Sequence, residues 1–463
     1  IKIPQIGIYQ YVTSNPNKIP ENKVIYVDWI TGKSYTFGEF KHESKKFAAG
    51  LQDMLEFKRA SVLIVHPEVL EIAIEALIDA KIPTSRVLLF GDKEINGYKP
   101  YRSILIGDRE IEPIYYTPEE VKSTTAYLLY SSGTTGKPKC IERTHTNVVA
   151  HLAQLIIIDS KLGPHSITMG VTGATTIIHS SFSIETLCES IQKYKINRIY
   201  AAPPIIFELV NYPLAQQFDL SSVDIIQSAG SPLDNKLERK FYEMFKIPIL
   251  QVYGLTEVSS VLYHPFDTVK NAFPGSVGFL VPSMKAKILS EDGHELGYNE
   301  PGELWVHGPN VMKGYLNNKE ATDSVIDKDG FFSTGDIVSV DEQGNFFIVG
   351  RKKELIIYKN FRVAPSELES ILLTHDAVLD AAVIGYYSEK EATELPTAYV
   401  TIKNEYGQSQ ALAKEIQSFV DEKVMSHKKL RGGVLFINRI PKNDIGKIQR
   451  RLLREKLKND VKE

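Results

Sequence analysis

Apolar runs of strand length alternate with helical patterns along much of this 463-residue chain, and this alternation is the feature that most constrains its fold. The strand-like runs cover residues 61–65, 86–90, 197–201, 224–227 and 248–253. The clearest helical patterns cover residues 68–80 and 235–245. Because strands that alternate with helices build parallel layers, the chain is predicted to be an α/β protein.

The pattern changes in the last third of the chain. From Glu303 onward, short strands separated by glycine turns replace the alternation. A domain boundary is expected near Gly350. Beyond it, the sequence predicts a helix from about Ser366, strands over 379–386 and 397–402, and a helix over 411–424. These elements form an α+β domain of about 110 residues, a normal domain size.

Composition limits the classes of function. Lys and Arg number 54 against 57 Asp and Glu, so the net charge of -3 gives no reason to expect nucleic acid or an anionic membrane as a partner. The two cysteines, Cys140 and Cys188, are too few for a disulfide framework, and no apolar run reaches the ~18 residues of a membrane span. These features predict a cytoplasmic protein with small-molecule partners. The final residues, VKE, are not the peroxisomal signal SKL, so a peroxisomal location is expected only if a C-terminal signal is missing from this chain.

The most informative motif, SSGTTGKPK at residues 131–139, follows an apolar run at 126–130. Glycines adopt backbone angles closed to other residues, so successive amide N–H groups can converge on an anion there. Hydroxyl and ammonium groups complete this pattern, which predicts a polyphosphate cradle formed by Ser131, Ser132, Gly133, Thr134, Thr135, Gly136, Lys137 and Lys139. Pro138 replaces the serine or threonine of a Walker A loop, which disfavours a P-loop NTPase. The alternative is a polar surface turn before a helix that begins near Thr144.

Five further motifs follow in order: YGLTE at 253–257, GELWVHG at 302–308, STGD at 333–336, GRKKELI at 350–356 and PKNDIGKIQRR at 441–451. Together with the cradle, they resemble the adenylate-forming superfamily of acyl-CoA synthetases, luciferases and peptide-synthetase adenylation domains. Within it, the chain looks most like the 4-coumarate:CoA ligases. The resemblance covers nearly the whole chain. It implies a large N-terminal domain, residues 1–351, with layered α/β sheets and a β-barrel-like part. It also implies a small mobile C-terminal α+β domain, residues 352–463.

The resemblance also implies a reaction in which a carboxylate attacks the α-phosphorus of ATP. The work of such a protein is charge neutralisation and alignment. The cradle would hold the β- and γ-phosphates, Thr256 the α-phosphate, and Glu257 the Mg²⁺ ion, which usually takes one or two protein carboxylates. Asp336 would accept hydrogen bonds from both ribose hydroxyls, with help from Arg351. Further expected contacts are Gln251, Tyr253, Gly254 and Arg362 for ATP or AMP, and Ala229, Gly230 and Val252 for the acyl group.

The implied C-terminal domain contributes the expected catalytic residue, Lys447. Its ammonium would bridge the substrate carboxylate and the α-phosphate as negative charge concentrates in the transition state. Gly446 before it permits a close approach to the other domain. Lys353 matches the hinge between an adenylating and a thioester-forming pose, and Lys359 and Asn360 match the tunnel that admits CoA.

Each of these positions also has an ordinary interpretation. Glu257 could be exposed at the end of a strand, and Asp336 could be a turn aspartate after Gly335. Lys353 could be an exposed linker residue, and Lys447 could be one basic residue of a solvated helix with Arg450, Arg451 and Arg454.

Three departures from the 4-coumarate:CoA ligase pattern affect the expected substrates. Val252 replaces a glycine of the acyl pocket, so a benzoate-sized or slender acyl group is as plausible as a hydroxycinnamate. Asn360 replaces a glycine of the CoA tunnel, where Asn tolerates left-handed backbone angles, and Ile357 and Arg362 also differ from that branch. The chain is short near residues 59 and 162, where family members carry tens of residues.

The sequence therefore predicts an ATP- and Mg²⁺-dependent ligase that joins a carboxylic acid to CoA and forms AMP. One alternative is an enzyme with a different outcome, either a luciferase-like monooxygenase or an adenylation-only enzyme. Asn360 is the position that separates a CoA ligase from an adenylation-only enzyme. The other alternative is a catalytically idle homologue that binds nucleotide. Lys447, Glu257 and the intact cradle argue against the idle homologue.

Overall fold

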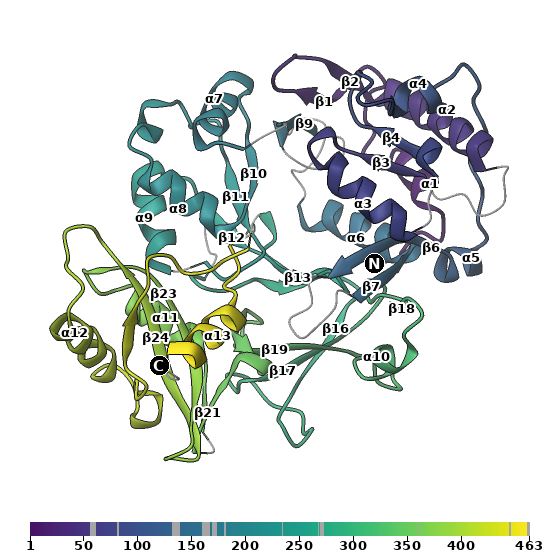
Figure 1. Cartoon of the computed structure of the whole chain (residues 1–463). Helices are drawn as coiled ribbons and strands as arrows, with labels where there is room; N and C mark the ends of the chain where they lie inside the picture. Colours follow the sequence, from purple (N-terminus) through teal and green to yellow (C-terminus); the bar gives the residue numbers. More distant parts are fainter. Residues whose placement is uncertain are drawn as a thin grey trace.

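The computed structural model describes residues 1–55, 62–80, 83–131, 139–159, 167–168, 174–179, 182–233, 235–266, 268, 273–359, 361–443 and 446–460. Figure 1 shows a large body, coloured from purple to green, beside a smaller body in yellow-green and yellow that ends with α13 (Arg450–Asp460). This arrangement agrees with the predicted mixed α/β fold, which has a large N-terminal and a smaller C-terminal domain. None of the helices in the described part combines the length and apolar character of a bilayer span.

The large body contains a three-stranded parallel sheet, which lies beside the teal helices in Figure 1. Its strands are β10 (Arg198–Ala201), β11 (Ile225–Ser228) and β12 (Ile249–Gln251), with α7 (Ile184–Tyr194), α8 (Pro203–Asn211) and α9 (Asn235–Phe245) between or before them. Buried Ile199, Ile226 and Ile249 join the core that these helices cover. Since Ala201 pairs with Ser228 and Ser228 with Gln251, the carboxyl ends of all three strands share one edge, where ligands bind in open α/β sheets.

Two further sheets lie in the N-terminal part of the chain. The first has the order β2-β1-β9-β8 and the second β3-β4-β5. Their strands are β1 (Val24–Asp28), β2 (Ser34–Thr36), β8 (Ile167–Thr168) and β9 (Thr175–Ile178), then β3 (Leu63–Val65), β4 (Val87–Leu89) and β5 (Lys99–Pro100). The accompanying helices are α1 (Ile8–Thr13), α2 (Phe37–Leu55), α3 (Leu70–Ala80), α4 (Tyr101–Leu105) and α5 (Pro118–Ser123), with single 3₁₀ turns η1 (Pro67–Val69) and η2 (Thr84–Arg86). A third 3₁₀ turn, η3 (Ala215–Gln217), lies between α8 and β11 of the parallel sheet.

Antiparallel sheets complete the large body, with the orders β18-β7-β6, β13-β14-β15 and β16-β17-β19-β20. The first contains β6 (Thr125–Ser131), β7 (Lys139–Thr144) and β18 (Gly314–Tyr315), and the second β13 (Tyr253–Leu255), β14 (Ser259–Tyr263) and β15 (Phe279–Leu280). The third contains β16 (Lys285–Leu289), β17 (Gly302–His307), β19 (Phe332–Val340) and β20 (Phe346–Arg351). The helices here are α6 (His145–Ile158), which Thr144 caps through Asn147 N–H, and α10 (Lys319–Asp323).

The small body packs α11 (Pro365–Leu372) and α12 (Gln410–Asp421) against a sheet of β23 (Val378–Ser388), β24 (Thr393–Ile402) and β25 (Val434–Phe436). The remaining elements are β21 (Ile356–Tyr358), β22 (Phe361–Val363), η5 (Lys352–Glu354) and η6 (Ser426–Lys428). Its apolar core is separate from the two larger cores of the big body. The proposed boundary at residues 351 and 352 coincides with the end of β20 and the start of η5.

The predicted elements exist with small shifts in their ends, apart from one strand. The sequence predicted a single strand over 248–253, but the structure divides it into β12 and β13. Val252 N–H still donates to Ser228 O at 2.9 Å, whereas Tyr253 turns to pair with Leu262 of the antiparallel sheet. The chain therefore changes sheets at Val252, the residue predicted to lie in the acyl pocket.

Candidate active site

A buried carboxylate, Asp336, lies at the centre of the predicted nucleotide site. It is 2% exposed on β19, directly opposite Arg351 of β20. Tyr253 OH donates to its Oδ2 at 2.7 Å, and Arg351 Nε lies 3.1 Å from its Oδ1. Burial raises the pKa of the Asp336 carboxyl, while Arg351 and the Tyr253 hydrogen bond oppose that rise. The structure thus brings together three residues that were predicted to contact ATP or AMP.

Lys447 reaches the same region from the small body. Its backbone N–H donates to Asn443 Oδ1 at 2.8 Å, and Asn443 N–H returns a bond to Lys447 O at 3.0 Å, so the loop is fixed before α13 begins. Burial, followed by Arg351, lowers the pKa of the Lys447 ammonium, whereas Glu354 and Asp336 raise it. Lys447 therefore lies within electrostatic reach of the Asp336 and Arg351 pair, and outside the solvated helix of the alternative interpretation.

Gly446 explains how this loop comes so close to the large body. Its φ of 78° lies in the left-handed region that favours glycine. A Cβ added there would lie 2.2 Å from Pro204 Cγ, at the start of α8. In Figure 1 the yellow segment before α13 approaches the teal helices of the large body. The contact between Gly446 and Pro204 is thus a direct junction between the two bodies.

Glu257 lies in the turn that follows β13, and its side chain is half-buried. Tyr315 OH donates to Glu257 Oε1 at 3.2 Å, and the Lys139 ammonium lies 4.7 Å from the centre of the Tyr315 ring. Lys139, the last residue of the predicted cradle, and the predicted metal ligand are therefore neighbours. The described residues contain no cluster of three or more His, Cys, Asp and Glu side chains. A single carboxylate with one oxygen already held by Tyr315 suits Mg²⁺, which takes its remaining ligands from phosphate and water.

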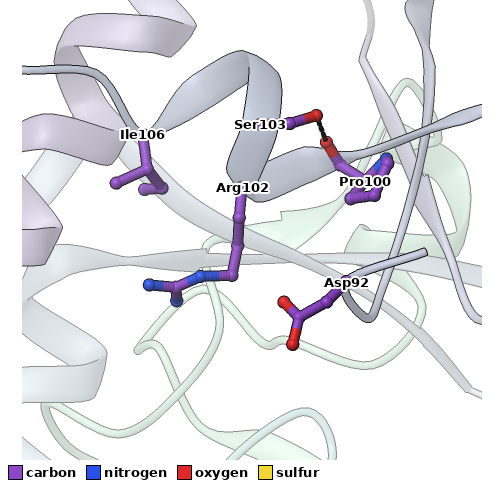
Figure 2. Close-up of a pocket in the computed structure, with 5 residues that line it drawn as sticks. All are labelled: Asp92, Pro100, Arg102, Ser103 and Ile106. Atoms are coloured by element: carbon purple, nitrogen blue, oxygen red, sulfur yellow. Dashed lines mark hydrogen bonds between the residues drawn. The ribbon is translucent and has the colours of Figure 1, made fainter. Parts of the chain in front are cut away.

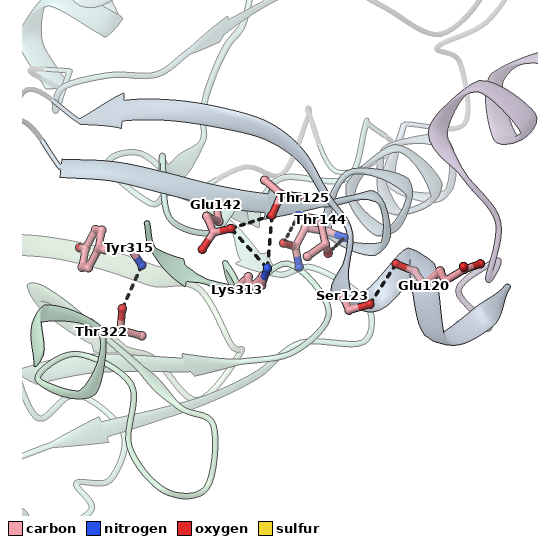
Figure 3. Close-up of polar contacts among 9 residues, drawn as sticks. Glu120, Ser123, Thr125, Glu142, Thr144, Lys313, Tyr315 and Thr322 are labelled. Carbon is pink, nitrogen blue, oxygen red and sulfur yellow. Dashed lines mark hydrogen bonds and ion pairs between the residues drawn. The ribbon is translucent and has the colours of Figure 1, made fainter. Parts of the chain in front are cut away.

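Polar contacts along the β6, β7 and β18 sheet hold Tyr315 in place (Figure 3). Lys313 Nζ lies 3.3 Å from Glu142 Oε1 of β7, and Thr125 OH of β6 donates to the same oxygen at 2.7 Å. Tyr315 N–H donates to Thr322 Oγ1 at 2.9 Å. These bonds tie β18 to β7, so the ring of Tyr315 stays between Lys139 and Glu257.

The predicted acyl residues lie at the carboxyl edge of the parallel sheet. Ala229 and Gly230 are exposed, and Gly230 has a φ of 95°. Val252 is half-buried beside the second large core. Gln251, by contrast, uses its amide within the fold: its Oε1 accepts from Leu233 N–H at 3.2 Å and its Nε2 donates to Glu238 at 3.3 Å. It is 7% exposed, so it supports the edge of the sheet.

The remaining predicted residues that the structure describes are exposed. Arg362 is exposed and forms an ion pair with Glu291 in the turn between β16 and β17. Lys353 is exposed within η5, and Lys359 has a φ of 44° with Nζ 3.7 Å from Glu391. Gly254 and Thr256 flank Leu255 and are exposed. Residues 132–138 of the cradle and Asn360 lie outside the described residues, as does the side chain of Ser131.

A cavity of 340 Å³ lies elsewhere in the large body, lined by Asp92, Pro100, Arg102, Ser103 and Ile106 (Figure 2). Arg102 Nη2 lies 3.0 Å from Glu43 Oε2 and is used in that ion pair. None of the predicted site residues lines this cavity.

Two residues next to the site were missed by the sequence analysis, Arg143 and Tyr315. Arg143 lies on β7 two positions after buried Ile141 and is itself 2% exposed. Because side chains two apart on a strand share a face, this alternation was the available signal for a buried arginine. Tyr315 lies in the segment after GELWVHG, where the sequence offered no chemical pattern around it.

Comparison with known proteins identifies the family of this chain. Residues 78–316 match the AMP-binding enzyme family, and residues 367–447 match the AMP-binding enzyme C-terminal domain. A 4-coumarate--CoA ligase from Pinus taeda is 33% identical over 93% of this chain and 91% of that protein. The chain belongs to the AMP-binding enzyme family. Within the adenylate-forming superfamily, it is a 4-coumarate:CoA ligase-like acyl-CoA synthetase, an AMP-forming acid–thiol ligase whose substrates include ATP and CoA.

Two other relatives of this AMP-binding enzyme bear on its outcome and fold. The luciferin 4-monooxygenase of Photinus pyralis is 39% identical over 72% of this chain and 63% of that protein. The crystal structure of a benzoate CoA ligase from Burkholderia xenovorans LB400 superposes with a TM-score of 0.80 over 97% of this chain and 99% of that chain, at 22% identity. The structural likeness shows that the fold is shared.

Proposed function

We propose that this ligase activates an aryl or acyl carboxylic acid at a site that includes Asp336, Lys447 and Glu257, with ATP and Mg²⁺, and then transfers the acyl group to CoA. The observation that carries the proposal is the position of Lys447, which Gly446 and Pro204 bring from the small body to the Asp336 and Arg351 pair. A site assembled from two bodies suits a reaction with two successive half-reactions. The two cysteines, Cys140 and Cys188, are free, which favours a cytoplasmic location.

In the first half-reaction, a carboxylate oxygen of the acid forms a bond to the α-phosphorus while the bond to the β-phosphate oxygen breaks and pyrophosphate leaves. The protonated ammonium of Lys447 would bridge the carboxylate and the α-phosphate, where charge concentrates. Asp336 would accept hydrogen bonds from the ribose hydroxyls and so fix the nucleotide. Arg351 offsets the negative charge of Asp336 and so opposes the rise that burial causes in the pKa of this carboxyl.

Glu257 would hold Mg²⁺, and Tyr315 would orient the carboxylate through its hydrogen bond. Such an ion supplies positive charge at the β- and γ-phosphates. Lys139, beside Tyr315, would add a second positive charge at the end of the cradle. Residues 131–136 of the cradle would contact the β- and γ-phosphates of ATP.

In the second half-reaction, the CoA thiol attacks the acyl carbonyl, and AMP leaves. Lys353 lies in η5 at the junction of the two bodies, where few residues would have to change backbone angles. Lys359, with its left-handed φ, and Asn360 would line the route of CoA. The small body is therefore proposed to rotate about Lys353 between the two steps.

The acid is proposed to be benzoate-sized, a slender acyl group or a hydroxycinnamate. Val252 occupies the break between β12 and β13 and would narrow the pocket beside exposed Ala229 and Gly230. A luciferase-like or adenylation-only outcome is the second candidate function, because the luciferin 4-monooxygenase of Photinus pyralis is among the relatives. An idle nucleotide-binding homologue is disfavoured, because Lys447 lies within electrostatic reach of Asp336.

The test is to give the protein ATP, Mg²⁺, CoA and one acid at a time from an aryl and aliphatic panel, and to measure pyrophosphate and acyl-CoA separately. The proposal expects both products with at least one acid. Accumulation of acyl-adenylate without acyl-CoA across the panel would favour the adenylation-only outcome. Absence of both products with every acid would favour the idle homologue.

A further inference from the structure

Arg143 is a charged residue in the wall beside the proposed metal site. It lies on β7, four positions after Lys139, and is 2% exposed. Its side chain shares the buried face of β7 with Ile141, which joins the second large core. Placing a guanidinium in such surroundings costs free energy unless its donors find partners.

The guanidinium uses its two terminal nitrogens on the turn that carries Glu257. Nη1 donates to Thr256 O at 3.0 Å, and Nη2 donates to Ser259 Oγ at 2.7 Å. Ser259 has a φ of 56°, which a non-glycine residue adopts only when its surroundings fix it. The two bonds therefore clamp both ends of a short turn, with Glu257 between them.

The charge of Arg143 is balanced differently from that of Arg198, another buried arginine. Arg198 forms an ion pair with both carboxylate oxygens of buried Asp159. Arg143 has no ion pair among the residues that the structure describes, and burial lowers its pKa to about 10, opposed only by Glu257. The carboxylate whose charge supports that of Arg143 is thus the proposed metal ligand itself.

We propose that Arg143 is a positioning residue that fixes the turn from Thr256 to Ser259, so that Thr256 and Glu257 face the polyphosphate and its metal ion. This inference rests on the proposed role of Glu257. Both ends of β7 would then contribute to the site, because the strand begins with Lys139 of the cradle and ends beside the clamped turn. Arg143 itself is buried and does not touch the substrate.

The test measures how Mg²⁺ changes the stabilisation of the protein by ATP. Melting temperatures are recorded with ATP and Mg²⁺ and with ATP and EDTA, and the Mg²⁺ concentration for half of the Mg²⁺-dependent shift is compared among variants. Loss of a side chain that orients a metal ligand typically costs about 10- to 100-fold in metal affinity. Arg143→Leu is expected to raise this Mg²⁺ concentration, called the Mg²⁺ half-point below, by that factor. Arg143→Lys, which keeps the charge but cannot donate in two fixed directions, is expected to recover only part of it.

Arg198→Lys is the matched control, because it makes the same change at a buried arginine that does not contact the turn. It is expected to lower the melting temperature of the free protein while leaving the Mg²⁺ half-point unchanged. If Arg143→Leu does not fold, Ser259→Ala removes one of the two acceptors and is expected to shift the half-point in the same direction by a smaller factor.

Two outcomes separate the inference from the site on which it rests. If Glu257→Gln leaves the Mg²⁺ half-point unchanged, the proposed metal ligand is wrong. If Glu257→Gln raises it but Arg143→Lys and Ser259→Ala behave as wild type, Glu257 keeps its role and the positioning role of Arg143 is overturned.

Discussion

On the nucleotide side of the candidate site, Asp336 is 2% exposed and each of its oxygens has a protein partner, Tyr253 or Arg351. On the acid side, Ala229 and Gly230 are exposed, and a Cβ added to Gly230 would meet no atom of the described residues within 4 Å. Buried charged groups therefore preorganise the nucleotide side, whereas the residues of the acid side are exposed and leave room for a ligand. Changes on the first side should therefore alter rate and affinity strongly, and changes on the second should alter selectivity.

The largest expected effect is that of Lys447→Ala. Removing one preorganised donor from a developing charge typically costs about 10²- to 10³-fold in rate, and a charged ammonium should cost at least that. Acid-dependent pyrophosphate release should fall accordingly, while conversion of a supplied acyl-adenylate to thioester should continue. Equal loss of both half-reactions would contradict the reading that Lys447 serves only the first.

The ionisation of Lys447 should make the rate of adenylation depend on pH. Burial and Arg351 lower the pKa of its ammonium below 10.5, so the proton is lost at a lower pH than from an exposed lysine. As the active form is protonated, adenylation should decline on the alkaline side before pH 10.5 is reached. Lys447→Arg, whose guanidinium keeps its charge, should lack this decline.

The second-largest effect is expected for Asp336→Asn, which should weaken ATP binding. A hydrogen bond to a charged group contributes about 1.5 to 3 kcal/mol, which predicts a rise of about 10- to 100-fold in the KM for ATP. Asp327→Asn is a suitable control, since Asp327 pairs with Lys287 on the edge strand of the same sheet and is not part of the site. A similar rise in both variants would mean that the sheet, and not the ribose contact, had been disturbed.

Gly446→Ala tests the junction between the two bodies. The added Cβ would lie 2.2 Å from Pro204 Cγ, so the loop of Lys447 must withdraw and adenylation should fall by about tenfold or more. Gly433→Ala is matched for backbone angle, because Gly433 has a φ of 80° and no described atom within 4 Å of the added Cβ. It should cost only about 1 to 2 kcal/mol of stability. Unchanged adenylation in Gly446→Ala would show that the junction is not required.

The two sides of the site also differ in how far the sequence predicts them. Asp336, Arg351 and Lys447 carry charges in recognisable motifs, and the structure brings them together across the two bodies. Gln251 was assigned to the nucleotide from its position alone, and in the structure its amide bonds Leu233 N–H and the Glu238 carboxylate. The clamp by Arg143 depends on a contact between β7 and a turn more than 100 positions later, which spacing along the chain cannot reveal.

The break between β12 and β13 is a further feature that the sequence did not predict. The run over 248–253 has the length and composition of a single strand. Local propensity does not distinguish one strand from two here. The neighbouring strands determine where the run is divided, because β12 pairs with β11 whereas Tyr253 pairs with β14. Val252 lies at this break, between the end of β12 and the start of β13.

The smallest expected effect, and the one that tests the acid side, is that of Val252→Gly. Removing the half-buried side chain at the break would widen the pocket beside Gly230, so kcat/KM for hydroxycinnamates should rise relative to benzoate-sized acids. Differences of one or two methylenes in an apolar pocket are worth about 1 to 3 kcal/mol, which limits the change in selectivity to about 10- to 200-fold. Val252→Ala should give an intermediate ratio with an unchanged KM for ATP, because the nucleotide side is built from other residues. A graded series from valine to glycine would place Val252 in the pocket wall, whereas an unchanged preference would place it outside and would leave the open edge at Ala229 and Gly230 as the part that selects the acid.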